Sequence, residues 1–351
     1  ALAAERGRLA GELTQREEEL AREREQLDSY KKEFDGFYHA VWATGWIETW
    51  KKYYYENYDK IEERIERLTA GMDEESRETV RRHCFRNFEL LPTQKNTELF
   101  LYCHDRLYTR SELEGAKTLG ELERFRESWR IPESATMETS VWRFDCGLKM
   151  LPQHVLDRLR GRTFIDGGAY WGDSALMMTQ YAPGRIYAFE PQPDTYQTLC
   201  GVLRDNGLDE LAVPVRAGLG ERGGTARLYT GSMISGANLF AVDPEIDGAR
   251  QHIDEIDIVS IDEMFRDRDE RVGLIKLDVE GSESAAVSGA MEIIRRDRPV
   301  LAVSVYHTPR DFFDIKPMLE KENLGYRFMV RKLVFHDLVT EVTLLAYTEE
   351  E

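Results

Sequence analysis

The sequence predicts an α/β protein with a doubly wound, mostly parallel sheet of seven strands, preceded by a coiled-coil helix and a helical region. Two observations support this prediction. From about residue 141, short apolar runs alternate with helical patterns, which is typical of a parallel sheet covered by helices on both faces. Before that point, leucines recur every seven residues at the start of the chain, and further helical patterns follow.

The seven expected strands are short and rich in β-branched or aromatic residues. They lie at 163–165, 185–189, 213–215, 273–277, 300–305, 326–330 and 342–347. Helical patterns at 173–181, 193–206, 282–295 and 310–322 separate most of them. An insertion around residues 229–238 has two glycines and small polar residues, so it suits either a mobile lid or an ordinary hairpin.

Residues 1–35 are almost entirely polar, with Leu13, Leu20, Leu27 and Phe34 spaced by seven. This spacing, with charges of both signs between, predicts a coiled coil that sets a homo-oligomer. A single solvated helix is the alternative. We expect the three parts of the chain to be the coiled coil at 1–35, an aromatic-rich helical region at 36–135 and the α/β domain at 136–351.

The helical region contains a column of aromatic residues spaced by four. Its members are Phe34, Tyr38, Trp42, Trp46, Trp50, Tyr54 and Tyr58. At about 100° per residue this column spirals around a straight helix, so it must pack against something. We expect it to pack against the neighbouring domain, and a sugar-stacking platform is the alternative.

The composition restricts the partners. The 351 residues carry a formal charge of −18, which would repel nucleic acid and an anionic membrane surface. No apolar run reaches the roughly 18–20 residues of a membrane span, and no secretory signal is evident. The four cysteines lack the spacing of metal ligands and are expected to be reduced, so the protein is predicted to be cytoplasmic.

A glycine-rich turn follows the first strand and predicts a cofactor site. The run is Asp166-Gly167-Gly168-Ala169-Tyr170-Trp171-Gly172-Asp173-Ser174. It lacks the dinucleotide pattern G-x-G-x-x-G, and the acidic Asp166 would repel a pyrophosphate. A carboxylate there suits the amino and sulfonium groups of S-adenosylmethionine. Glu190, before Pro191 at the tip of the second strand, is placed to accept both ribose hydroxyls.

Two further strand ends predict the catalytic side. Asp278 and Glu280 follow the fourth strand, and alternation places both on one side while Val279 turns to the core. The fifth strand ends in Tyr306-His307, and a histidine with an ordinary pKa of roughly 6.5 is a natural general base. We therefore predict His307 as the base, with Asp278 and Glu280 orienting an acceptor hydroxyl.

Structural roles are the alternative for these residues. One carboxylate would cap the helix and the other would bind the cofactor amine, and His307 would be a hydrogen-bonded structural residue. Asp278 and Glu280 could also hold magnesium. No third ligand is evident, so no metal is predicted.

Three blocks of the sequence resemble the FkbM-type methyltransferase family. They are Ile165–Ser174, Tyr187–Pro191 and, above all, Ile275-Lys276-Leu277-Asp278-Val279-Glu280-Gly281-Ser282-Glu283. The resemblance implies a class I methyltransferase fold, S-adenosylmethionine as cofactor, and O-methylation of a small-molecule or glycan acceptor. Similar proteins often carry the pair Tyr306-His307. The expected cofactor contacts are Asp166, Gly168, Ala169, Tyr170, Gly172, Asp173, Ser174, Glu190, Pro191 and Asp278.

Two other functions remain open at this stage. A methyltransferase-fold module could bind without catalysing and serve assembly through its coiled coil, although the intact Asp166 loop and Glu190 argue against this. A nucleotide-sugar or NAD-dependent oxidoreductase is disfavoured because G-x-G-x-x-G is absent.

Overall fold

The computed structural model describes residue 16 and residues 46–90, 120–133, 135, 138–230, 237–238, 252–334 and 339–349. The predicted coiled coil at 1–35 lies outside these ranges except for residue 16. The coiled coil and the homo-oligomer therefore stay predictions.

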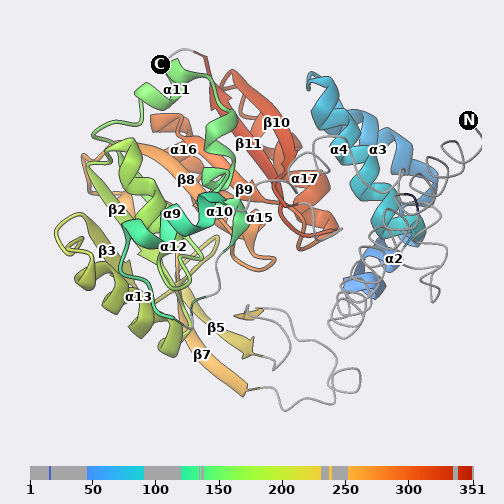
Figure 1. Ribbon diagram of the computed structural model, residues 1–351. Coiled ribbons are helices and arrows are strands. Elements are labelled where there is room, and N and C mark those ends of the chain that lie inside the picture. Colours follow the sequence, from blue (N-terminus) through green and yellow to red (C-terminus); the bar gives the residue numbers. More distant parts are fainter. Residues whose placement is uncertain are drawn as a thin grey trace, which may run out of the picture.

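A seven-stranded sheet forms the centre of the molecule, with strand order β10-β11-β9-β8-β1-β2-β3 (Figure 1). All neighbouring pairs are parallel except those made by β11, which is antiparallel to β9 and β10. The strands are β1 (Thr163–Gly167), β2 (Arg185–Phe189), β3 (Ala212–Val215), β8 (Val272–Leu277), β9 (Val300–Ser304), β10 (Tyr326–Lys332) and β11 (Val342–Thr348). The predicted α/β class with its mostly parallel, seven-stranded sheet is confirmed, and so are all seven predicted strands.

The helical elements precede the sheet or connect its strands. In chain order they are α2 (Trp46–Glu56), η1 (Tyr58–Lys60), α3 (Ile61–Thr69), α4 (Glu74–Phe85), η2 (Arg86–Leu90), α9 (Gly120–Ser128), α10 (Thr139–Trp142), η3 (Asp145–Met150), α11 (Gln153–Asp157), α12 (Asp173–Met178), η4 (Thr179–Tyr181), α13 (Pro193–Asp205), α14 (Ile261–Phe265), α15 (Glu283–Ser288), α16 (Met291–Asp297) and α17 (Pro309–Glu320). Within the described ranges, every helix is too short or too polar to span a bilayer.

The sheet is buried on both faces, and successive strand residues enter two separate cores. Phe164 packs with α12 and α13, whereas its neighbour Ile165 packs with α15, α16 and α17. Ile186 and Tyr187 divide between the two cores in the same way. This alternation explains why the central strands are largely apolar, since a strand covered on both sides has no solvated face.

A second sheet is inserted between β3 and β8. It contains β4 (Gly218–Leu219), β5 (Gly224–Thr230), β6 (Ala237–Asn238) and β7 (His252–Val259), in the order β4-β7-β5-β6. Figure 1 shows β5 and β7 projecting from the main body. The sequence indicated only an insertion near 229–238. Its central residues, 231–236, lie outside the described part of the chain, so the suggested lid stays a prediction.

The N-terminal helices cover the β10 edge of the main sheet (Figure 1). Ser76 Oγ of α4 accepts a hydrogen bond of 3.0 Å from Val330 N, a backbone group of that edge strand. Arg331 donates two hydrogen bonds to the Asp73 carboxylate, at 3.1 and 2.8 Å. Asp73 also caps α4 by accepting from Ser76 N at 2.8 Å. One polar cluster therefore starts the helix and joins it to the sheet.

Part of the aromatic column packs as expected. Trp50 is completely buried among Phe88, His83 and Phe312 of α17, and Tyr54 stacks against Phe88. These residues join the same apolar core as the sheet. Tyr58, by contrast, is 63 % exposed. The domain boundary near residue 135 stays a prediction, although α2, α3 and α4 share this core.

Candidate active site

A pocket opens at the carboxyl ends of β1, β2 and β8, where ligands bind in sheets of this kind. Its empty space, which includes the part of the mouth that is open to solvent, amounts to about 870 Å³. Its lining comes from five parts of the chain: Glu138 and Val141; Gly168, Tyr170 and Asp173; Phe189, Glu190, Pro191 and Gln192; Ala217, Gly218, Leu219 and Leu228; Lys276, Asp278, Val279 and Glu280.

The loop after β1 approaches the end of β8 closely because residue 168 is glycine. Gly168 has φ +72°, and a Cβ there would lie 1.8 Å from the carbonyl oxygen of Asp278. The amides of Gly168 and Ala169 both donate to Phe189 O, at 3.1 and 2.9 Å. Gly172, at φ +105°, begins α12. The glycines therefore hold the loop against both neighbouring strands.

Asp166 faces a buried lysine, which the sequence analysis did not single out as a site residue. Lys276 Nζ lies 3.2 Å from Asp166 Oδ1 and donates to the carbonyl oxygen of Gly168 at 2.7 Å. Ser174 Oγ donates to Asp166 Oδ2 at 2.6 Å. Burial lowers the pKa of Lys276, but the negative charges of Asp166 and Asp278 raise it by a larger amount, so the pKa lies above its ordinary value. Lys276 is thus a cation that holds the glycine loop.

The other side of the pocket is acidic. Glu190, at the tip of β2, accepts a hydrogen bond from Gln192 N at 2.8 Å, and burial raises its pKa to about 7. Burial also raises the pKa of Asp173 to about 7, against the opposing charge of Lys276. Glu138 lies across the pocket, and burial together with the charge of Asp173 raises its pKa well above the ordinary value. This lining suits a ligand that carries positive charge.

Beyond β8 the chain turns sharply, and Asp278 and Glu280 lie on this turn. Glu280 has φ +54°, so the extended alternation assumed from the sequence is wrong here: the strand ends at Leu277. Glu283 fixes the turn with its completely buried carboxylate. It accepts hydrogen bonds from Val279 N at 2.8 Å and Gly281 N at 2.9 Å.

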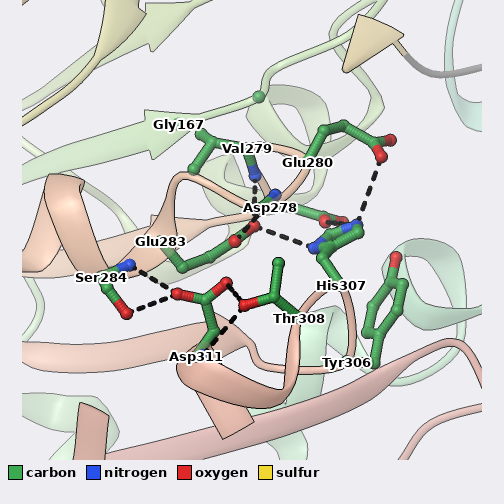
Figure 2. A network of polar contacts seen from close by, with 12 residues as sticks. Gly167, Asp278, Val279, Glu280, Glu283, Ser284, Tyr306, His307, Thr308 and Asp311 are labelled. Carbon is green, nitrogen blue, oxygen red and sulfur yellow. Dashed lines mark hydrogen bonds and ion pairs between the residues drawn. The ribbon is translucent and has the colours of Figure 1, made fainter. Parts of the chain in front are cut away.

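His307, beyond β9, lies among these carboxylates (Figure 2). Its Nε2 is 3.6 Å from Asp278 Oδ1 and 3.4 Å from Glu280 Oε2, and its Nδ1 is 2.9 Å from Glu283 Oε1. Burial lowers its pKa, but the charges of Glu283 and Glu280 raise it more, and the result is well above the ordinary value. The expectation of an ordinary pKa is therefore wrong, because three carboxylates from a neighbouring loop surround the ring.

Asp311 ties together the two loops that carry this cluster. One of its oxygens accepts from the backbone and hydroxyl of Ser284, and the other accepts from Thr308 Oγ1 at 2.6 Å (Figure 2). Tyr306 packs against the His307 ring, with ring centres 4.1 Å apart. Its hydroxyl donates to Glu341 Oε1 at 3.1 Å, so it holds the loop before β11.

The predicted site residues fall into two groups. Gly168, Tyr170, Asp173, Glu190, Pro191, Asp278 and Glu280 line the pocket. His307 contacts two of them, whereas Asp166, Ala169, Gly172, Ser174 and Tyr306 support the lining from behind. Their functional roles stay predictions. Two charged residues of the pocket were not predicted from the sequence: Lys276, which was visible as the one charge in an apolar strand, and Glu138, for which the sequence gives no signal.

Comparison with known families finds one matching family model. Residues 166–328 match the family model described as methyltransferase FkbM domain. The resemblance inferred from the three sequence blocks is confirmed over these residues. No curated protein sequence matches the chain.

One solved structure supports the same fold, and a second is similar to a lower degree. Methyltransferase FkbM from Methylobacillus flagellatus KT is similar at 22 % identity and a TM-score of 0.53, over 85 % of this chain and 61 % of its own. The chain thus spans less than two thirds of that relative. An O-methyltransferase from Bacillus cereus in complex with SAH has 13 % identity and a TM-score of 0.38, over 72 % of this chain and 98 % of its own.

Proposed function

Because residues 166–328 match a methyltransferase FkbM domain, we propose that the chain transfers a methyl group from S-adenosylmethionine to a hydroxyl oxygen. We propose a small polar acceptor, namely a sugar or glycan precursor. The observation that carries this is a single pocket where Glu190 at the end of β2 faces Asp278 and Glu280 beyond β8.

The residues present fit S-adenosylmethionine. Glu190 offers a carboxylate for the ribose hydroxyls, and Asp173 offers one for the positive amino group. Phe189 and Leu219 offer apolar surface for the adenine ring. Gly168 keeps this part of the pocket free of a side chain. When bound, the cofactor supplies an electrophilic methyl group on a sulfonium.

The chain's contribution to transfer is positioning and removal of a proton. Asp278 and Glu280 accept a hydrogen bond from the acceptor hydroxyl and aim its oxygen for the in-line displacement. Glu280, whose pKa burial raises to about 7, takes the hydroxyl proton as the methyl group is transferred. His307 contacts both carboxylates and Glu283, so it holds them in place. The acidic lining favours a neutral, hydroxyl-rich acceptor over an anionic one.

The test is cofactor binding combined with an acceptor screen. We expect the protein to bind S-adenosylhomocysteine in calorimetry, and to add the mass of one methyl group to a sugar hydroxyl when S-adenosylmethionine is present. Glu190→Ala should weaken cofactor binding by roughly 10- to 100-fold, because charge-assisted hydrogen bonds are lost. The matched control is Glu210→Ala, which removes an exposed glutamate outside the pocket.

Each result has a separate meaning. Equal affinity in the Glu190 and Glu210 variants would refute the cofactor assignment. Normal cofactor binding without methyl gain on any acceptor would instead support the non-catalytic module. Glu280→Gln should abolish methyl gain while leaving cofactor affinity nearly unchanged, and the opposite pattern would place Glu280 at the cofactor.

A further inference from the structure

Side chains from two neighbouring strand ends converge beside the pocket. Asp278, Glu280 and Glu283 follow β8, and His307 follows β9 (Figure 2). Asp278, Glu283 and His307 each offer one oxygen or nitrogen atom, and these atoms lie within 4.8 Å of one another. The His307 side chain is only 7 % exposed and points into the acidic group.

The cluster contains polar atoms that the described part of the chain leaves unsatisfied. Asp278 Oδ1 and His307 Nδ1 are buried, and neither makes a hydrogen bond there. Nδ1 lies 2.9 Å from Glu283 Oε1, yet the arrangement does not have hydrogen-bond geometry. Both atoms lie in ion pairs within the cluster, but neither makes a hydrogen bond of good geometry. Buried polar atoms that lack a well-formed hydrogen bond cost free energy, so these two atoms point to a missing ligand.

The charge balance indicates the sign of that ligand. Among the described residues, no lysine or arginine forms an ion pair with Asp278, Glu280 or Glu283, and Lys276 pairs with Asp166 instead. Even a protonated His307 leaves an excess of negative charge. Closely packed carboxylates of this kind are costly unless a cation joins them.

We propose that Asp278, Glu283 and His307 bind a divalent cation of the magnesium or manganese class. Two carboxylates and one imidazole are suitable ligands, and ligands about 2.1 Å from such an ion lie roughly 3 Å apart when adjacent. One possible ligand atom from each of the three residues lies within 4.8 Å of the others. Glu283 Oε1 is 2.9 Å from His307 Nδ1 and Asp278 Oδ1 is 3.6 Å from Nε2, so a rotation of the imidazole ring would bring one of its nitrogens towards both carboxylates.

The existing hydrogen bonds of Glu283 are compatible with this role. Each of its oxygens accepts one backbone amide, and a carboxylate oxygen has a second lone pair for an ion. Glu280 Oε2, 3.4 Å from His307 Nε2, is near enough to supply a fourth ligand. Remaining coordination positions would face the pocket and hold the acceptor hydroxyl. That last role rests on the proposed methyl transfer, whereas cation binding does not.

The test uses manganese as a paramagnetic probe on chelator-treated full-length protein without cofactor. Titration followed by electron paramagnetic resonance of free Mn²⁺ should show one strong site per chain, which Mg²⁺ displaces. Electron spin echo modulation of the wild-type complex should show coupling to an imidazole ¹⁴N. This readout needs no variant, so it cannot fail through misfolding.

Variants locate the site. Asp278→Asn should weaken Mn²⁺ binding by at least the roughly 10- to 100-fold seen when outer-shell groups are lost. His307→Gln should remove the ¹⁴N coupling, and Glu190→Gln, on the opposite side of the pocket, should change neither. Absence of ¹⁴N coupling in the wild type, or equal Mn²⁺ affinity in Asp278→Asn and Glu190→Gln, would overturn the proposal. Normal S-adenosylhomocysteine binding in the same sample would then leave the proposed function intact.

Discussion

Replacing Gly168 by alanine tests whether the close contact between β1 and β8 builds the cofactor site. Gly168 has φ +72°, and an added Cβ would lie 1.8 Å from Asp278 O, where atoms closer than 3.0 Å essentially never occur. The loop or the Asp278 backbone must therefore shift by more than 1 Å. Both segments line the pocket, so the shift changes the site itself.

A matched control separates the effect of the collision at Gly168 from the effect of backbone strain. Gly161 has nearly the same φ, +74°, but a Cβ there meets nothing within 4 Å. Alanine at either position costs about 1–2 kcal/mol of stability through the left-handed backbone. Only Gly168→Ala adds the collision. A displacement of about 1 Å in a positioned site lowers activity by about 10²-fold. We therefore expect Gly168→Ala to lower cofactor affinity or turnover by about that factor.

Calorimetry with S-adenosylhomocysteine and urea unfolding of both variants give the two quantities. Gly161→Ala should lose stability but bind normally, whereas Gly168→Ala should lose both. If the two variants bind the cofactor equally well, the close approach of Gly168 to Asp278 does not shape the site, and the reasoning fails.

Three further predictions concern buried charges. Lys276→Met should lower the free energy of unfolding by about 3–5 kcal/mol, because Asp166 keeps a buried charge without its cation. Adding Asp166→Asn to this variant should restore part of the lost stability, measured by urea unfolding. Losses that simply add in the double variant would refute the pairing. Cofactor affinity should fall as pH drops below about 7, because burial raises the pKa of both Glu190 and Asp173 to about 7 and their ionised forms bind the ribose hydroxyls and the amino group. Glu190→Gln should make this fall shallower by removing the Glu190 contribution, and an unchanged profile would contradict the assignment. Burial raises the pKa of Asp73, but hydrogen bonds from Arg331 and Ser76 and the charge of Arg331 together lower it more, to about 2 against an ordinary 3.8. Asp73 therefore adds stability above pH 3.8 that is lost as pH falls towards 2. Because Asp73 is 43 % exposed we expect about 1 kcal/mol, absent in Asp73→Asn in acid titrations of unfolding.

The main sheet was predictable because its strands are buried on both faces. Such strands read as short apolar runs, and the turns between them are rich in glycine and polar residues. The inserted sheet was not predictable in this way. Half of β7, His252–Val259, is polar or charged, so hydrogen bonding to β5 rather than burial defines it as a strand.

The residues of the site were predictable where they follow the ends of strands. The carboxyl ends of parallel strands meet at one edge of the sheet, which brings Glu190, Asp278 and His307 to one region. The distances within that region were not predictable. The pKa of His307 depends on Glu283, whose role as the cap of a sharp turn appears only in three dimensions. Glu138 reaches the pocket from a segment far away in the sequence.

The way the sheet ends has a consequence for association between molecules. A sheet can recruit strands from another copy only through a free edge. At β10, Ser76 of α4 already accepts the Val330 amide. At the opposite edge, β3 has only four residues, and one of them is Pro214, which has no amide to donate. A chain shortened past α4 would therefore expose β10, and it should aggregate through intermolecular strand pairing at concentrations where the longer chain stays dispersed.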